Sequence, residues 1–180
     1  MILPVLPLLN MADRHPGLTS ALAEAYLQAA RVCLDRHHIP PQEFTIENGK
    51  FESRTIVDWQ PADQRSQLAW ANANDATRDG AYVCALAATE LHMGLCAVKR
   101  AETLTGADYY IAPLGRDAEY LEDCLRLEVS GTNLDISEVH RRLRNKVSQA
   151  ELGASSLPAL AVVVGFKVRL IAMESVKEAS

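Results

Sequence analysis

The sequence lacks most of the short motifs by which catalytic sites are recognised. It has no G-x-x-x-x-G-K-[ST] phosphate-binding loop, no G-x-G-x-x-G turn and no G-x-S-x-G nucleophile elbow. Its four cysteines form no C-x-x-C pair, and the cysteines and histidines do not have the spacing of a zinc site. We therefore expect buried free thiols in a reducing compartment, and a function that uses none of these motifs.

The chain also lacks a basic surplus and a membrane-length apolar run. Its formal net charge is −5 over 180 residues, whereas proteins that bind nucleic acid with their whole surface are usually basic. Any contact with nucleic acid must therefore be local. The apolar segment 1–10 is short and contains prolines, and the later run 157–166 has the length of a strand. We expect a cytoplasmic protein without a membrane segment.

Hydrophobic residues make up 48% of the chain and charged residues 23%, which is typical of a soluble globular domain. The first half of the sequence predicts helices and one hairpin. Asn48-Gly49, between two β-branched and aromatic runs, is a strong hairpin signal. The predicted elements are a helix over 18–38, the hairpin over 44–57, a helix over 61–74, an interruption at Gly80 and a helix over 81–93.

The second half of the sequence predicts a sheet. Strand patterns cover 95–103, 107–112 and 121–129, the last ending at Gly131, and a helix capped by Asp135 or Ser137 extends to about Leu152. The apolar run 157–166 is typical of a strand buried on both faces, and 168–173 predicts a final strand. We expect an α/β or α+β fold: a mixed sheet flanked by helices over 80–180, with residues 1–79 as a helical and hairpin extension packed on it.

Three carboxylates lie at informative positions in this pattern. Glu90 shares a helix face with apolar residues, Asp108 begins the second strand of the sheet, and Glu128 lies near the end of the third. Neighbouring strands are about 4.8 Å apart, so carboxylates on them converge. Converging carboxylates repel one another unless a cation lies between them, and Mg²⁺ prefers such oxygen ligands. The alternative is that each acidic side chain is simply solvated.

This ordered set resembles the PD-(D/E)XK nuclease superfamily, which has the restriction-endonuclease-like fold. The family core is a helix, three strands, a helix and a strand, with an acidic residue from the first helix, an Asp from the second strand and a Glu-x-Lys from the third. The matching positions are Glu90, Asp108 and Glu128, and Gly106-Ala107-Asp108 resembles the turn before the family's Asp. The resemblance covers residues 80–173 and implies a Mg²⁺ or Mn²⁺ site held by these three carboxylates.

One position departs from the family pattern. The family's lysine, which supports the attacking water and the charge on phosphate, corresponds here to Ser130. A serine supplies a hydrogen bond but no charge. We expect the cation to come from a neighbouring element, with Lys146 ranked first, or catalysis to have been lost. The other candidates for this cation are Arg142, Arg126 and Lys99.

The segment 140–146 is the only concentrated basic stretch. As a helix beside the carboxylates, it is predicted to hold phosphates through Arg141 and Arg142, with Ser130 and Gln149 also contacting substrate. The position of Gln149 is implied by relatives of the RecB nuclease type. The alternative is a solvated helix face paired with Glu138 or Glu151.

These patterns and the resemblance favour a Mg²⁺- or Mn²⁺-dependent nuclease that hydrolyses phosphodiester bonds, in DNA more than in RNA. Two alternatives stay open. The first is a nuclease-fold subunit without catalytic activity that binds or regulates a partner. The second is an unrelated α/β interaction protein whose carboxylates are solvated. Residues 1–79 are expected to supply any interface for a homodimer or another protein.

Overall fold

The computed structural model describes residues 2–103, 105–115, 121–153 and 155–176. The helices are α1 (Ser20–Asp35), α2 (Gln64–Ala69), α3 (Ala73–Met93) and α4 (Ile136–Leu152), with 3₁₀ turns η1 (Met11–Asp13) and η2 (Leu121–Asp123). The strands are β1 (Gln42–Asn48), β2 (Phe51–Val57), β3 (Leu95–Arg100), β4 (Tyr109–Pro113), β5 (Leu125–Thr132), β6 (Ala159–Gly165) and β7 (Leu170–Val176).

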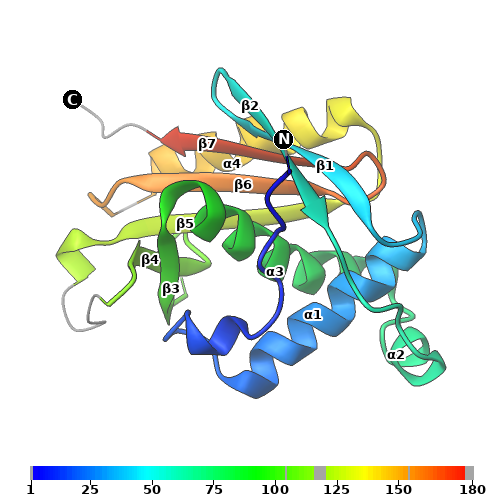
Figure 1. Cartoon of the computed structure of the whole chain (residues 1–180). Coiled ribbons are helices and arrows are strands. Elements are labelled where there is room, and N and C mark those ends of the chain that lie inside the picture. The colour runs from blue at the N-terminus through cyan, green and yellow to red at the C-terminus, as the bar shows by residue number, and fades with distance from the viewer. Residues whose placement is uncertain (1, 104, 116–120, 154, 177–180) are drawn as a thin grey trace.

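All seven strands form one mixed sheet in the order β2-β1-β7-β6-β5-β4-β3. The β1–β7 and β5–β6 pairs are parallel, and the other pairs are antiparallel. Helix α4 packs on one face of the sheet, and α3 with α1 outside it covers the other (Figure 1). The predicted α/β class is therefore confirmed. The predicted order of helix, three strands, helix and strand is present as α3, β3 to β5, α4 and β6.

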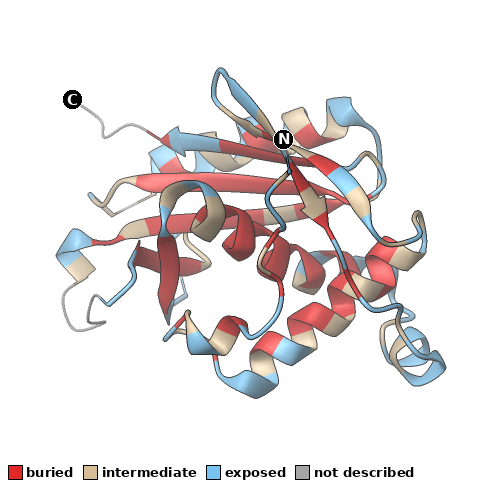
Figure 2. Ribbon diagram, in the orientation of Figure 1, coloured by how far each residue is buried: buried red, intermediate tan, exposed pale blue. Residues whose placement is uncertain are grey.

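Helix α3 forms the centre of the core. From Gly80 to Thr89 every residue is buried, and most of these residues are alanine or other small residues (Figure 2). The small side chains let the sheet and α1 approach closely from opposite sides. The Cβ that alanine would place at position 80 would lie 2.8 Å from the backbone of Ala30 on α1. Gly80 is thus the point at which the two helices touch.

Two predicted boundaries in this region are wrong. Gly80 was expected to interrupt the helix, but it lies inside α3, because contact with α1 there requires a residue without a side chain. The helix expected over 61–74 is reduced to the six residues of α2, because Asn72 caps a new helix by accepting hydrogen bonds from two backbone N–H groups.

Strand β5 carries the alternation that the sequence predicted. Leu127 and Val129 belong to the core under α3, whereas Glu128 points to the opposite face, where α4 packs. Gly131 was expected to end this strand but lies within it. A Cβ at position 131 would lie 2.6 Å from the Thr77 carbonyl oxygen, so glycine is needed where β5 passes α3. Strand β6 is buried along its whole length, as predicted.

The N-terminal segment covers both edges of the sheet. At the β2 edge, Leu6 donates a backbone hydrogen bond of 2.8 Å to the Ile56 carbonyl. At the β3 edge, Gly17 donates one of 2.9 Å to Ala97. Between these contacts the segment passes along α3 (Figure 1), with Leu8 buried in the core. Pairing of both edges removes the exposed backbone groups that favour association between sheets.

All four cysteines are free and buried, as the sequence predicted. None of the helices in the described ranges has the combination of length and hydropathy that a membrane span requires.

The contact at Gly80 makes the stability of this core testable. Gly80→Ala gains about 1 kcal/mol of helix propensity, but the new methyl meets the Ala30 backbone, which cannot rotate away. We expect a net loss of about 1–3 kcal/mol in the free energy of unfolding, measured by urea denaturation. Ser148→Ala, at an exposed position of α4, is the control and should be close to neutral. An equal or higher stability of Gly80→Ala would contradict this account.

Candidate functional site

Asp108 precedes β4 and lies beside β5 where the pairing of the two strands begins. The first paired residues are Tyr109 and Leu127, and the Asp108 N–H donates a hydrogen bond of 2.7 Å to the Leu127 carbonyl. The Val129 N–H donates a hydrogen bond of 2.7 Å to Asp108 Oδ2 instead of to a backbone carbonyl. This bond holds the Asp108 carboxylate against β5, close to Glu128.

Glu128 is almost fully buried, with a side chain that is 6% exposed. Its Oε2 accepts a hydrogen bond of 2.9 Å from Lys146 Nζ on α4. No hydrogen bond from a described residue reaches Oε1, which lies 4.0 Å from the position of a Cβ on the exposed Gly106. Burial raises the pKa of Glu128, Lys146 opposes this rise, and the nearby charge of Asp108 adds to it.

Helix α4 brings a second cation to the same strand. Arg142 Nη1 donates hydrogen bonds of 3.3 Å to Ser130 Oγ and 3.0 Å to the Gly131 carbonyl. The Ser130 hydroxyl is therefore bound by an arginine from the helix. Lys146 follows one turn later and reaches Glu128. Both cations come from α4 to β5, so the structure places Lys146 beside Glu128.

Arg126, on the same face of β5, is 3% exposed. Its Nε and Nη2 donate to the carbonyls of Leu157 and Ala150 at 3.0 and 3.1 Å. Within the described ranges its Nη1 has no hydrogen-bond partner, and the Arg126 charge opposes the raised pKa of Glu128. Lys99, the last of the candidates for this cation, is paired with Glu102 on the exposed edge of the sheet.

The second oxygen of Asp108 connects the site to an aromatic cluster. Tyr82 on α3 donates a hydrogen bond of 2.9 Å to Asp108 Oδ1. Burial, with the Asp108 charge as the next cause, raises the pKa of Tyr82 to about 12, so its hydroxyl keeps its proton. Arg100 on β3 contacts Tyr82 as well. Sequence analysis missed both residues, because no spacing links β3 and α3 to Asp108 before the chain folds.

The structure does not bring Glu90 to this pair. Glu90 lies eight residues after Tyr82, which is about 12 Å along the axis of α3. There its Oε1 accepts a hydrogen bond of 2.6 Å from Arg14, and its Oε2 pairs with His15 Nε2 at 2.9 Å. The residue expected as a third metal ligand is thus a half-buried anchor for the N-terminal segment, because the sequence pattern placed it on an inner face but could not supply its partners.

His15, Glu90 and Cys96 have potential ligand atoms within 4.8 Å of one another. The hydrogen bonds oppose metal binding here. The Ala97 N–H donates a bond of 2.9 Å to His15 Nδ1, so the neutral ring carries its proton on Nε2 and donates it to Glu90. A metal on Nε2 would require an imidazolate, and the Arg14 guanidinium already neutralises Glu90. We regard this cluster as structural.

The remaining predicted contacts lie on the outer face of α4. Arg141 is exposed and donates two hydrogen bonds of 2.7 Å to Glu138. These bonds, with one from Arg142, lower the pKa of Glu138 to about 2. Gln149 is exposed, whereas Lys146 is half-buried beside Glu128. The face of α4 that carries Arg141 therefore matches the solvated, Glu138-paired alternative, and the inward residues contact the strand.

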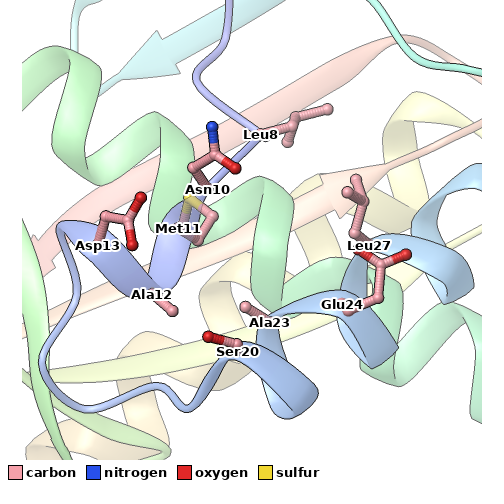
Figure 3. A pocket seen from close by; sticks show the side chains of 9 residues that line it. All are labelled: Leu8, Asn10, Met11, Ala12, Asp13, Ser20, Ala23, Glu24 and Leu27. Atoms are coloured by element: carbon pink, nitrogen blue, oxygen red, sulfur yellow. The ribbon is translucent and has the colours of Figure 1, made fainter.

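A separate cavity of about 260 Å³ lies between η1 and the start of α1 (Figure 3). Its lining is partly polar and partly apolar, and among the described residues none of the three predicted carboxylates contributes to it. Its lining residues are Leu8, Asn10, Met11, Ala12, Asp13, Ser20, Ala23, Glu24 and Leu27. The cavity is therefore distinct from the Asp108 and Glu128 site.

Comparison of the chain with protein-family models, with curated proteins and with solved structures gives no significant match in any of the three. The function is therefore argued from the geometry of the site.

The His15 anchor predicts a pH dependence of stability. Burial lowers the pKa of His15 below its ordinary value of 6.5. Between the lowered pKa and 6.5 the unfolded chain binds more protons, so the free energy of unfolding falls as the pH decreases through this window. His15→Gln should make this dependence shallower in chemical denaturation at several pH values.

The difference in the free energy of unfolding between wild type and His15→Gln at pH 8 serves as the baseline. At this pH the difference reflects the lost hydrogen bonds and not the titration of His15. Parallel pH profiles of the two proteins below 6.5 would show that His15 is not held neutral.

Proposed function

We propose that this protein is a divalent-metal-dependent nuclease that uses Mg²⁺ or Mn²⁺ to hydrolyse phosphodiester bonds, in DNA more than in RNA. The observation that carries the proposal is that the Asp108 carboxylate is bound to the Val129 N–H, next to Glu128 in β5, with Lys146 Nζ 2.9 Å from Glu128. Two carboxylates and an ammonium group from neighbouring elements are a set that can hold a metal and a phosphate.

The donor set fits a hard cation. Asp108 accepts one hydrogen bond on each oxygen, which leaves a lone pair on each. Glu128 Oε1 accepts no hydrogen bond from the described residues and faces the exposed Gly106. Hard cations are held by one or two carboxylates, with water and substrate phosphate completing the coordination.

In this proposal each residue has a distinct role. Asp108 and Glu128 hold the metal, which when bound lowers the pKa of an attacking water and neutralises charge on the phosphate. Lys146 donates a hydrogen bond to that water or to a phosphate oxygen, replacing the lysine that is absent at Ser130. Glu90 takes no part, because Arg14 and His15 hold it farther along α3.

The proposed partner is DNA, bound locally because the net charge of the chain is −5. On α4, the exposed Arg144 has no ion pair among the described residues and is available for a backbone phosphate, unlike Arg141. The four free thiols support a cytoplasmic location.

Removal of one carboxylate charge tests the metal site. Glu128→Gln should weaken Mn²⁺ binding, measured by calorimetry, by more than tenfold, since even residues that only orient a ligand contribute about 10–100-fold. The same variant should no longer nick supercoiled plasmid. Glu174→Gln is the matched control, because Glu174 is exposed on β7 and should retain wild-type binding and nicking.

Two results would contradict the proposal: no Mn²⁺ binding by the wild-type protein, or equal binding by the wild type and Glu128→Gln. Thermal unfolding of each variant shows whether a lost activity reflects a lost fold.

One observation favours a second candidate, the nuclease-fold binding subunit without activity. The Lys146 ammonium pairs with the Glu128 carboxylate, so the buried charge of Glu128 is balanced by a residue of the chain itself. The two candidates differ in what the lysine does. In the nuclease it acts on substrate, whereas in the inactive subunit it only balances a buried charge.

Lys146→Met separates the two candidates. For a nuclease, Mn²⁺ binding should persist, because both carboxylates remain, while the nicking rate should fall by about 100-fold or more, as for other groups that stabilise transition-state charge. The rate is measured in single-turnover plasmid assays, with Lys146→Arg as the charge-conserving comparison. A nicking rate equal to that of the wild type would remove Lys146 from the mechanism. A wild-type protein that binds Mn²⁺ but nicks no DNA would favour the inactive subunit.

A further inference from the structure

Arg100 lies at the end of the edge strand β3, and its side chain is held by aromatic groups on three sides. Its guanidinium carbon lies 4.7 Å from the ring centroid of Tyr82 and 4.7 Å from that of Tyr109. Its Nη1 donates a hydrogen bond of 3.2 Å to the hydroxyl of Tyr26, and its Nη2 donates one of 3.2 Å to that of Tyr82. Two cation–π contacts and two hydrogen bonds thus hold the guanidinium in place.

The tyrosines that hold Arg100 are themselves fixed by burial and by one another. Tyr26, Tyr82 and Tyr109 come from α1, α3 and β4 and are all buried. The hydroxyls of Tyr26 and Tyr109 are hydrogen-bonded at 2.8 Å, and the rings of Tyr26 and Tyr82 lie 5.0 Å apart. An arginine supported in this way loses little side-chain entropy when it binds a ligand.

Arg100 is exposed, and no carboxylate in the described part of the chain forms an ion pair with it. Other arginines are occupied by such a partner: Arg14, Arg54, Arg78, Arg141 and Arg142 each contact an acidic side chain within 3.2 Å. The hydroxyls of Tyr26 and Tyr82 each take one of the five N–H donors of Arg100, and the guanidinium of this exposed residue keeps further donors for an external acceptor. The planar guanidinium matches the oxygens of a phosphate.

The fixed guanidinium lies next to the proposed metal site. Only the Tyr82 hydroxyl separates them, because it accepts from Arg100 at 3.2 Å and donates to Asp108 at 2.9 Å. Arg100 is linked to Asp108 through Tyr82 on the α3 side of the sheet, whereas Lys146 contacts Glu128 directly from the α4 side. A nucleic-acid strand whose scissile phosphate meets the carboxylates would bring a neighbouring phosphate to one of these flanks.

We infer that Arg100 binds a backbone phosphate of the nucleic acid beside the one that is cleaved, and that the Tyr26, Tyr82 and Tyr109 cluster exists to hold the guanidinium for this contact. This inference deepens the proposed nuclease function and depends on it for the identity of the ligand. Arg100 is then a substrate-binding residue, and Tyr82 links it to the metal ligand Asp108.

The test measures DNA affinity and its salt dependence. A fluorescein-labelled DNA duplex is titrated with protein in Ca²⁺, another hard cation that takes oxygen ligands, and anisotropy is recorded at several NaCl concentrations. Arg100→Gln should weaken binding by about tenfold, as expected for one charge-assisted contact. The slope of log K against log salt should decrease by about 1, because one phosphate is no longer neutralised.

The matched control is Arg54→Gln, which removes the same charge from an exposed position on β2 at the other edge of the sheet. It should leave the affinity and the salt slope at the wild-type values. Arg100→Lys keeps the charge but loses the fixed fork, so its affinity should lie between those of the wild type and Arg100→Gln. Thermal unfolding verifies that each variant is folded.

Mn²⁺ calorimetry on the same proteins separates this inference from the proposed function. Unchanged Mn²⁺ binding by Arg100→Gln, together with weaker DNA binding, supports the phosphate contact. Wild-type affinity and slope in Arg100→Gln overturn the contact, even where the wild-type protein binds metal and nicks DNA. A wild-type protein that binds no DNA also overturns the contact. If the protein binds DNA through Arg100 but does not bind Mn²⁺, the phosphate contact is supported and the nuclease function is contradicted.

Discussion

The burial of α3 on nearly all sides is the constraint on which the rest of the structure depends. Its alanines and Gly80 have small side chains, so the sheet and α1 both approach its backbone closely. Because the helix cannot shift without opening these contacts, the polar residues along it are fixed relative to the strands. Near the middle of α3, Tyr82 donates a hydrogen bond to Asp108. Two turns later, Glu90 anchors the N-terminal segment through Arg14 and His15.

The candidate site is a balance of charges assembled from both faces of the sheet. Two acidic side chains lie near the point where the β4–β5 pairing begins, and burial makes the charge on Glu128 costly. The protein places Lys146 and Arg126 near Glu128 from one face, and Arg100 near Asp108 through Tyr82 from the other. A cation between the carboxylates would add to this balance.

Helix α4 brings two cations to β5. Ser130 lies on β5 facing α4, and its hydroxyl accepts a hydrogen bond from Arg142. The next turn of α4 carries Lys146 to Glu128, so the helix adds positive charge beside the buried carboxylate. An apolar layer that includes Val139 and Leu143 packs α4 on the neighbouring strands β6 and β7 and so positions both cations.

The sequence by itself determined the class of the fold and the order of its elements. Alternation along β5, the Asn48-Gly49 turn and the apolar run of β6 are local signals, because each depends on neighbours along the chain. The same local signals placed Asp108 and Glu128 at neighbouring strands, whereas the ranking of Lys146 came from the resemblance to a nuclease family.

Only the tertiary structure decided what lies across from each of these residues. It showed that Gly80 is a helix contact and not a helix break, that Glu90 pairs with Arg14 and His15, and that Arg100 makes cation–π contacts with tyrosines from other elements. These contacts join residues far apart in the chain, and their partners follow from packing distances that no periodicity encodes.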